Sequence, residues 1–549
     1  MKKLHKKGAA LTLALALLTA LLAACSGGNN AKSGNEGGGS ASSPAASASE
    51  EWQKTAPGSG GQALPVTQQL KEYTFMAREL GGVPFKDSFV VLPELERRTN
   101  VKLNLIKVPE SNYGDKLNVV MASGELPDLI AGVNINVANE FGPKGLFLNL
   151  WDYIDIMPNM KKAFETYPEF NDYKYSDTEL YQVLNQCAPD SDPQGFGFYK
   201  QIPMIRTDVL KTLNLEAPKT FDELRDTLVR IKEAYPDSRP WISDGRGFEF
   251  LQQVLAGWNG KILEPNYYYS AFDPEAGQWG FAPEQEGFKE LVEYMHGLYA
   301  DGLLDNEFFL TNNSQSTERA VNDKGFFYYS YWNNSATMTL RGQENGNPNF
   351  LMSGILPIVK DGPSAAVVRN ACSNFSAVNA KVSDPEPLLK ALDYWLYSQD
   401  GTMLANAGIE GVNFVWEEDQ KIYKLVDPKL EKPDNETHKA EFGVRYDFMT
   451  GLRPDHFDIH NKLEDPDNDM YHQQFLLYKD HAISPGPVKI FKDPEDSNTM
   501  SEIGVPIRDY VEQQFIKFVM GAANMSTWDQ FIETCKKMGS DKMIELLNK

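Results

Sequence analysis

The sequence predicts an α/β protein that folds into more than one lobe. Segments with strand-like and helix-like patterns alternate from Tyr73 onward, and this order is typical of a largely parallel sheet covered by helices. A second region with the same alternation begins near Tyr181. The folded stretch, from about Leu70 to Lys549, is also too long to share one hydrophobic core.

The first region shows a β-α-β-α-β order. Asp87 is expected to cap the first helix, because a carboxylate accepts hydrogen bonds from backbone N–H groups that a first turn leaves free. Gly124 is expected to end the second helix, because glycine readily adopts the left-handed conformation of a helix C-terminus. The five segments are predicted at residues 73–77, 87–100, 101–108, 113–124 and 129–131.

The second region carries clear helix starts. Residues 220–223 (Thr-Phe-Asp-Glu) form a capping-box pattern, and apolar residues from Phe288 to Tyr299 form a helical stripe. Residues 325–334 are predicted to be a strand with its exit loop, and Pro385 opens a further helix. The chain ends in amphipathic helices.

The N-terminus has the features of a bacterial secretion signal. Four lysines among the first seven residues precede an uncharged run from Gly8 to Ala24, which is short for a transmembrane helix. The run ends in Leu-Ala-Ala-Cys, which resembles a lipobox and implies that residues 1–24 are removed and that Cys25 carries a diacylglycerol. The alternatives are an ordinary signal peptide in which Cys25 is incidental, or a cytoplasmic chain with an apolar start.

A low-complexity segment follows the lipobox. From Ser26 to about Gln62 the chain is mostly Gly, Ser, Ala and Asn, so it cannot bury enough apolar surface to offset its ordering entropy. A Gly/Ser coil of about 40 residues reaches roughly 35 Å. Residues 25–69 are therefore predicted to be the lipidated cysteine and a flexible linker that holds the folded part near the membrane.

The composition is that of an acidic globular protein. Hydrophobic residues make up 42% of the chain, and the formal net charge of −23 becomes more negative once the four leader lysines are removed. Such a chain is a poor ligand for nucleic acid or anionic lipid, so membrane contact is expected through the lipid anchor alone. The sequence contains no phosphate-binding P-loop and no Gly-x-Ser-x-Gly elbow, and no cofactor is expected.

Cysteine usage leaves one question open. Once Cys25 is lipidated, Cys187, Cys372 and Cys535 remain, and three cysteines outside the cell permit one disulfide at most. Cys535 lies on an apolar helical stripe that begins at Trp528, so it is expected in the core. A bond between Cys187 and Cys372 is allowed, but the sequence alone does not decide it.

Six short segments of the sequence, taken in order, resemble segments of the extracellular solute-binding proteins that serve ABC sugar importers. The segment Met121–Leu129 reads MASGELPDL, which resembles the family's helix-to-strand signature. The length resembles the large members of the family, which include alginate-binding proteins and firmicute lipoproteins of the LipO type. The six segments lie at Leu92–Leu103, Met121–Leu129, Ile205–Leu210, Trp395–Gly401, Gly408–Phe414 and Thr527–Phe531.

The resemblance implies a two-lobed, periplasmic-binding-protein-like α/β fold of type II, with the ligand cleft between the lobes. The chain would cross between the lobes near residues 186–203, 356–374 and 408–414. Lobe 1 would comprise residues 70–190 and 358–412, lobe 2 would comprise residues 191–357, and residues 413–549 would complete lobe 2 and the hinge.

The resemblance also implies a function. The two lobes would close around an oligosaccharide, and the permease subunits of an ABC transporter would recognise the closed form. The protein would act as a lipid-anchored monomer on the extracellular face of a Gram-positive-type cell membrane and would not be an enzyme. A peptide or other solute as the ligand, and a surface enzyme that acts on polysaccharide, are the alternatives that the sequence leaves open.

Aromatic residues followed by amides are the main ligand-binding candidates. Sugars present apolar C–H faces and a ring of hydroxyls, which favour aromatic platforms and planar polar side chains. Tyr331, Trp332 and Asn333 follow an aromatic strand and are expected to form the main platform, at a position where the family places an aromatic. Trp258 and Asn259 form a second candidate platform. Either tryptophan could instead be a core residue.

Charged residues supply the remaining candidates. Arg78 follows the first strand, at the end where parallel sheets present ligand-binding loops, although it could also be a solvated or ion-paired surface group. Asp128 could accept sugar hydroxyls or cap the neighbouring turn. Further candidates near the expected third wall of the cleft are Arg369, Glu410, Arg445 and Tyr446.

No metal site is expected. The alginate-binding relatives carry a calcium loop at the position of Tyr235–Pro240, which here has too few oxygen ligands. An EF-hand-like start at Asp465 lacks the glycine and the glutamate that such a loop requires. His456 and His460 have helical metal-ligand spacing but no third ligand in a recognisable motif.

Overall fold

The folded part of the chain forms two lobes, each with its own sheet and its own hydrophobic core. This confirms the α/β, two-lobe class predicted from the sequence. The computed structural model describes residues 59–549 except for 81–82, 188–200, 244–249, 265–266, 332, 365, 368–371, 418–421, 426–434, 445, 447–449, 453–476, 479 and 484–485.

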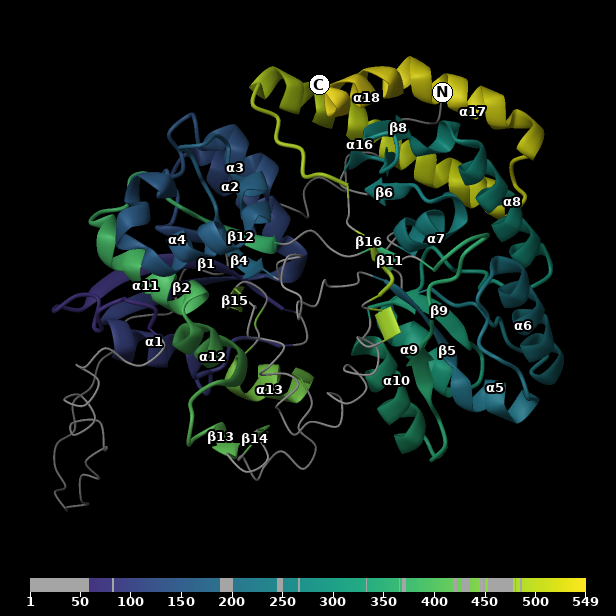
Figure 1. The fold of residues 1–549 in the computed structure, drawn as a ribbon, viewed down its shortest axis with the longest axis horizontal. Coiled ribbons are helices and arrows are strands. Elements are labelled where there is room, and N and C mark those ends of the chain that lie inside the picture. The colour runs from purple at the N-terminus through teal and green to yellow at the C-terminus, as the bar shows by residue number, and fades with distance from the viewer. Residues whose placement is uncertain are drawn as a thin grey trace, which may run out of the picture. The chain divides into compact units, whose positions relative to one another are not determined.

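Lobe 1 is built on a six-stranded sheet with the order β15-β4-β12-β3-β1-β2. Neighbouring strands are parallel except at β12, which runs antiparallel to β3 and β4. Figure 1 shows the green strands β12 and β15 beside the purple and blue strands of the N-terminal region. The strands are β1 (Lys71–Glu79), β2 (Val101–Pro109), β3 (Leu129–Ala131), β4 (Val183–Cys187), β12 (Cys372–Val378) and β15 (Gly451–Leu452).

Helices cover the sheet of lobe 1, and the five segments predicted for the first region are confirmed. Gly124 ends α2 with a positive φ of 68°, as expected. The prediction that Asp87 caps α1 is wrong: the helix has no side-chain cap, and the backbone N–H of Val90 donates to the carbonyl of Phe442 at 2.9 Å instead. The helices are α1 (Val91–Thr99), α2 (Tyr113–Ser123), α3 (Ile135–Phe141), α4 (Pro158–Thr166), α11 (Pro385–Tyr397), α12 (Gln399–Ala407) and α13 (Asn435–Phe442).

Residues 59–69 pack against lobe 1, although they were predicted as the end of the flexible linker. Gln62 is buried, and its amide donates to the buried carboxylate of Asp393 at 3.0 Å. Asn159 donates to the carbonyl of Ser59 at 3.0 Å and to Asp393 at 2.8 Å. The packed chain therefore begins at least as early as Ser59.

Lobe 2 contains two small antiparallel sheets, with orders β10-β5-β9 and β6-β7-β8, and the pair β11-β16. The predicted capping box at Thr220 and Glu223 is present at the start of α6. The strands are β5 (Ile202–Arg206), β6 (Ile262–Glu264), β7 (Ser270–Asp273), β8 (Gln278–Phe281), β9 (Phe327–Ser330), β10 (Met352–Gly354), β11 (Ala366–Val367) and β16 (Ala482–Ile483).

The last three helices of the chain complete the core of lobe 2 (Figure 1, yellow). Cys535 lies in this core and is fully buried, as predicted. The helices of lobe 2 are α5 (Thr207–Leu213), α6 (Phe221–Ala234), α7 (Phe250–Asn259), α8 (Glu286–Ala300), α9 (Asn313–Val321), α10 (Asn333–Glu344), α16 (Pro494–Val519), α17 (Trp528–Met538) and α18 (Ser540–Asn548).

One stretch assigned by the sequence to lobe 2 and the hinge packs in lobe 1. Val444, Tyr446 and Leu452 belong to the hydrophobic core of lobe 1, and β15 extends its sheet. The hairpin β13–β14 (Phe414–Glu417 and Ile422–Leu425) precedes this stretch. None of the helices in the described part of the chain combines the length and the apolar character needed to span a membrane.

Candidate ligand-binding site

The strand directions place one candidate residue at the edge of the lobe 1 sheet from which the chain leaves for lobe 2. Because β12 runs antiparallel to both β3 and β4, β4 points the same way as β1 and β3. The carboxyl ends of β1, β3 and β4 therefore meet at one edge. Arg78 lies there, at the end of β1, and open α/β sheets commonly bind ligands at the carboxyl edge.

Arg78 and Tyr113 lie close together at this edge. Tyr113 is buried, and its hydroxyl donates to the carbonyl of Ala131, the last residue of β3, at 2.5 Å. Burial raises the pKa of the Tyr113 hydroxyl, and the nearby Arg78 guanidinium partly opposes this effect. Arg78 itself is half-buried.

A disulfide joins the two strands through which the chain leaves and re-enters lobe 1. Cys187 is the last residue of β4, Cys372 is the first residue of β12, and they form the bond that the sequence left undecided. They are 185 residues apart in the sequence but opposite each other in the sheet. The strands β5, β9 and β10 of lobe 2 lie between them in the chain.

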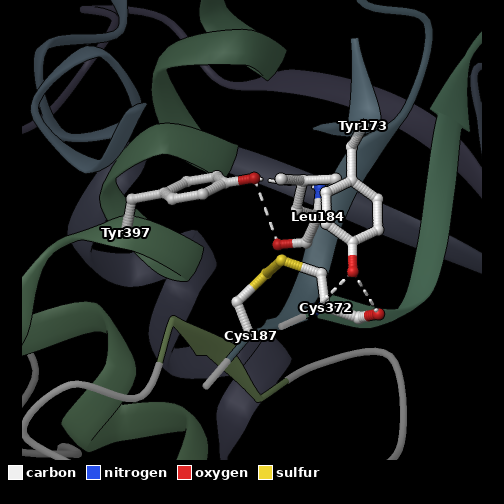
Figure 2. The surroundings of a disulfide bond; sticks show 5 residues. All are labelled: Tyr173, Leu184, Cys187, Cys372 and Tyr397. Carbon is white, nitrogen blue, oxygen red and sulfur yellow. Dashed lines mark hydrogen bonds between the residues drawn. A yellow bond between two sulfur atoms is a disulfide. The ribbon is translucent and has the colours of Figure 1, made fainter. Parts of the chain in front are cut away.

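Two buried tyrosines hold the backbone on either side of this disulfide (Figure 2). The Tyr173 hydroxyl accepts from the N–H of Cys372 at 2.8 Å and donates to its carbonyl at 3.1 Å. The Tyr397 hydroxyl accepts from the N–H of Leu184 at 2.9 Å and donates to its carbonyl at 3.1 Å. The N–H of Cys372 therefore bonds Tyr173 and not the backbone of Cys187. In an antiparallel sheet, two opposed residues that share no backbone hydrogen bond have the closest side chains, which suits a disulfide.

The predicted aromatic platform follows β9 in lobe 2, at the edge where the chain arrives from lobe 1. Ile202, the first residue of β5, pairs with Ser330, the last residue of β9. Tyr331 comes next and is half-buried, and its carbonyl accepts from the N–H of Asn334 at 2.9 Å. Trp332 and the side chain of Asn333 lie outside the described residues, so their part in the platform stays a prediction.

Trp258 and Asn259 lie at the end of α7, among other helices of lobe 2. The Trp258 ring packs against Phe221 and Tyr294, with ring centroids 4.8 Å and 5.2 Å away, and its indole N–H donates to Glu290 at 3.2 Å. Asn259 accepts from the N–H of Lys261 at 3.1 Å. Both residues therefore have local structural partners, and none of these partners is a predicted site residue.

Asp128 ties two strands of lobe 1 together at the edge opposite Arg78. Its carboxylate accepts from the backbone N–H of Thr74 at 2.7 Å and from the Thr74 hydroxyl at 2.8 Å. Asp128 precedes the first residue of β3, so it lies at the amino end of that strand. Its hydrogen-bonding partner is a strand residue rather than the neighbouring turn.

The other candidates are spread over lobe 1 and the chain that follows it. Tyr446 is completely buried, and its hydroxyl donates to the carbonyl of Val83 at 2.7 Å, so we leave it out of the proposed site. Glu410 is exposed in the turn before β13. Arg369, Arg445 and the lipidation candidate Cys25 lie outside the described residues.

The loop after α6 is closed by an ammonium group of the chain itself. Lys232 donates to the carbonyls of Pro236 and Ser238 at 2.7 Å and 2.6 Å. Burial lowers the pKa of Lys232, and Arg239 adds to this effect. Within the described ranges, no three His, Cys, Asp or Glu side chains are grouped as metal ligands would be, while His456, His460 and the segment at Asp465 fall outside them.

Two α/β lobes, each with its own strands and core, between which the chain passes more than once, are typical of two-lobe binding proteins. The family model described as "Bacterial extracellular solute-binding protein" matches residues 88–403. The chain therefore belongs to the bacterial extracellular solute-binding protein family.

Full-length relatives agree with this assignment. The chain is 22% identical to the polygalacturonan/rhamnogalacturonan-binding protein YtcQ of Bacillus subtilis, over 90% of this chain and 93% of YtcQ. It is 22% identical to the fructooligosaccharide ABC transporter substrate-binding protein FusA of Streptococcus pneumoniae, over 84% of this chain and 86% of FusA. Among solved structures, the alginate-binding protein AlgQ2 superimposes with a TM-score of 0.70 at 21% identity, over 88% of this chain and 98% of AlgQ2, and shares the fold.

Proposed function

We propose that this protein captures an oligosaccharide outside the cell and delivers it to the permease of an ABC transporter. The observation that carries the proposal is the similarity, over more than four fifths of the chain, to two relatives whose names specify carbohydrate ligands. Both relatives match across both lobes rather than across one domain. The protein would bind its ligand without converting it.

We place the ligand between the carboxyl edge of the lobe 1 sheet and the end of β9 in lobe 2. Arg78 would contribute a charged hydrogen-bond donor from lobe 1, and Tyr331, Trp332 and Asn333 would contribute a ring and an amide from lobe 2. A sugar that touches both lobes would bind the closed arrangement more tightly than the open one, and this difference in affinity is what shifts the population toward closure.

We further propose that the mature protein is a lipoprotein. The support is the lipobox-like end of the leader at Cys25 and a 22% identical relative, the lipoprotein LipO of Bacillus subtilis, matched over 83% of this chain. A stable anchor requires two or more acyl chains, because each buried methylene contributes only about 0.8 kcal/mol. Incorporation of labelled palmitate in cells, lost on Cys25→Ala, tests this part of the proposal.

A thermal-shift panel tests the ligand class. The chain from Ser26 onward would be heated with neutral fructo-oligosaccharides, acidic galacturonan and alginate fragments, and peptides of similar mass. We expect at least one glycan to raise the melting temperature in a saturable way and to be recovered intact by chromatography. Stabilisation by peptides alone would contradict the carbohydrate proposal, and shortened products would contradict binding without conversion.

A further inference from the structure

Three chain segments next to the lobe crossings lie side by side in the sheet of lobe 1. The order β15-β4-β12 makes β4 the centre of the group. Cys187 pairs with Leu452 of β15 on one side and with Cys372 of β12 on the other. The disulfide therefore lies where the connections to lobe 2 begin and end, at a position fully buried on β4 and nearly so on β12.

Each of the three segments has its own attachment to the body of lobe 1. Tyr173 holds Cys372, and Tyr397 at the end of α11 holds Leu184 (Figure 2). On β15, Gly451 has a φ of +71°, and a Cβ there would lie 2.5 Å from the carbonyl of Leu396. Only glycine allows β15 to approach α11 this closely.

We propose that the Cys187–Cys372 disulfide and the two tyrosine clamps form a rigid hinge base that prevents β4 and β12 from separating when the lobes move. The strands β4 and β12 then stay fixed to the body of lobe 1, so lobe 2 turns about a fixed origin. The inference rests on the two-lobe fold, and it does not depend on which ligand the protein binds.

A stabilising role alone does not account for this arrangement. A disulfide that closes a long loop stabilises a fold wherever in the structure its two cysteines lie. Here the bond joins strands that are already paired at Gln186–Ser373 and Leu184–Phe375, and each strand is also clamped by a tyrosine. These separate attachments lie together where the connections to lobe 2 begin and end, which is where a hinge base is required.

The distribution of distances between the lobes tests the proposal. Spin labels would be attached through non-cysteine chemistry at Val119 on α2 and Glu233 on α6, which are 62% and 67% exposed. Double electron–electron resonance would measure the distance between the labels in the unliganded protein and in the Cys187→Ala/Cys372→Ala double variant. Cys535→Ala would serve as the buried-cysteine control. We expect a clearly broader distance distribution in the double variant and an unchanged one in the control.

An unchanged width in a double variant with native circular dichroism would overturn the proposal and leave the disulfide a purely stabilising role. Should the double variant not fold, Tyr173→Phe and Tyr397→Phe keep the disulfide and remove the clamps one at a time. Each of these is expected to broaden the distribution, and an unchanged width in both would equally overturn the hinge base.

Discussion

Single buried side chains take the place of a neighbouring strand along one side of a strand. Tyr173 and Tyr397 each bond both the N–H and the carbonyl of one strand residue. Gln253 does the same for Val367, donating at 2.7 Å and accepting at 2.9 Å. An unsatisfied buried polar group costs about 1–3 kcal/mol, so these contacts let short strands end inside the protein. No local sequence signal predicts them, because the partners are 114 to 213 residues apart.

Arg206 is another buried polar residue on which the fold depends. Its guanidinium forms a bidentate ion pair with the Asp208 carboxylate at 2.8 and 2.7 Å and donates to Asp323 at 2.9 Å. The guanidinium carbon lies 3.7 Å from the centre of the Phe350 ring. We expect Arg206→Ala to lower the free energy of unfolding by about 2–5 kcal/mol, because it removes a buried side chain with its hydrogen bonds and its contact with the Phe350 ring and leaves a cavity. Urea denaturation measures this.

The exposed pair of Arg230 and Glu233 is the control for that experiment. Both side chains are more than half exposed, so Arg230→Ala is expected to change the free energy of unfolding by less than about 1 kcal/mol. Equal losses for the two arginine variants would contradict the structural role of Arg206.

Trp332 is the residue on which the proposed sugar platform depends most. We expect Trp332→Ala to weaken oligosaccharide binding by about 1–3 kcal/mol while the melting temperature of the unliganded protein stays the same. Trp151 is the control, because its ring packs on Phe164 beneath Lys174 in lobe 1. An affinity loss for Trp151→Phe equal to that for Trp332→Ala would argue against the platform.

At the scale of elements, the sequence predicts what local patterns encode. The apolar periodicity locates β1, α1, β2, α2 and β3, and Gly124 marks the end of α2. The capping box locates the start of α6. The start of α1 was predicted wrongly because a distant carbonyl, that of Phe442, replaces the expected Asp87 cap. The disulfide could not be assigned, because its pairing depends on β12 joining the sheet beside β4.

The candidate site residues were chosen at strand ends, where sheets present ligand-binding residues. Arg78 lies at the end of β1 and Tyr331 follows β9, and their contact with a ligand stays a prediction. Tyr446 was predicted near the third wall of the cleft, but it is completely buried and packs against Phe85 and Phe89. Whether an aromatic residue faces solvent or a core depends on segments far away in the chain.

A charged cluster joins α1 to the α11–α12 pair in lobe 1. Burial tends to raise the pKa of Glu94, but hydrogen bonds from Arg97 and Arg98 bring it below the ordinary value of 4.5. Arg98 also bonds Tyr394 and Asp400. A carboxylate with a lowered folded-state pKa stabilises the fold above its unfolded pKa, and this contribution is lost as the pH falls through the folded value.

We therefore expect Glu94→Gln to be less stable than the native chain at pH 7, by about 1–3 kcal/mol. The difference should narrow as the pH falls below about 4.5, where Glu94 begins to protonate in the unfolded chain, and should be smallest once the pH is below the lowered folded-state pKa. Chemical denaturation at several pH values measures both effects. Glu96→Gln, on the same helix, is the control, and a stability difference for Glu94→Gln that does not vary with pH would contradict this account.

At the scale of the whole molecule, the folded unit begins earlier than composition indicates. Gln62 and Leu64 are buried, and Gln62 helps satisfy the carboxylate of Asp393. We expect a chain that starts at Ser59 to be as stable as one that starts at Ser26. A chain that starts at Lys71 should lose about 2–4 kcal/mol, because it loses both the hydrogen bond and the apolar burial. Equal stability of the two truncated chains in urea would contradict this boundary.

The whole molecule is, in our account, a two-lobe clamp for a carbohydrate. Titration of the chain from Ser26 onward with an oligosaccharide, followed by intrinsic tryptophan fluorescence, tests this claim most directly. We expect a saturable change in fluorescence that is weaker for Trp332→Ala, and we expect the sugar to be recovered unaltered. No saturable response to any glycan, while a peptide or another solute gives one, would contradict it.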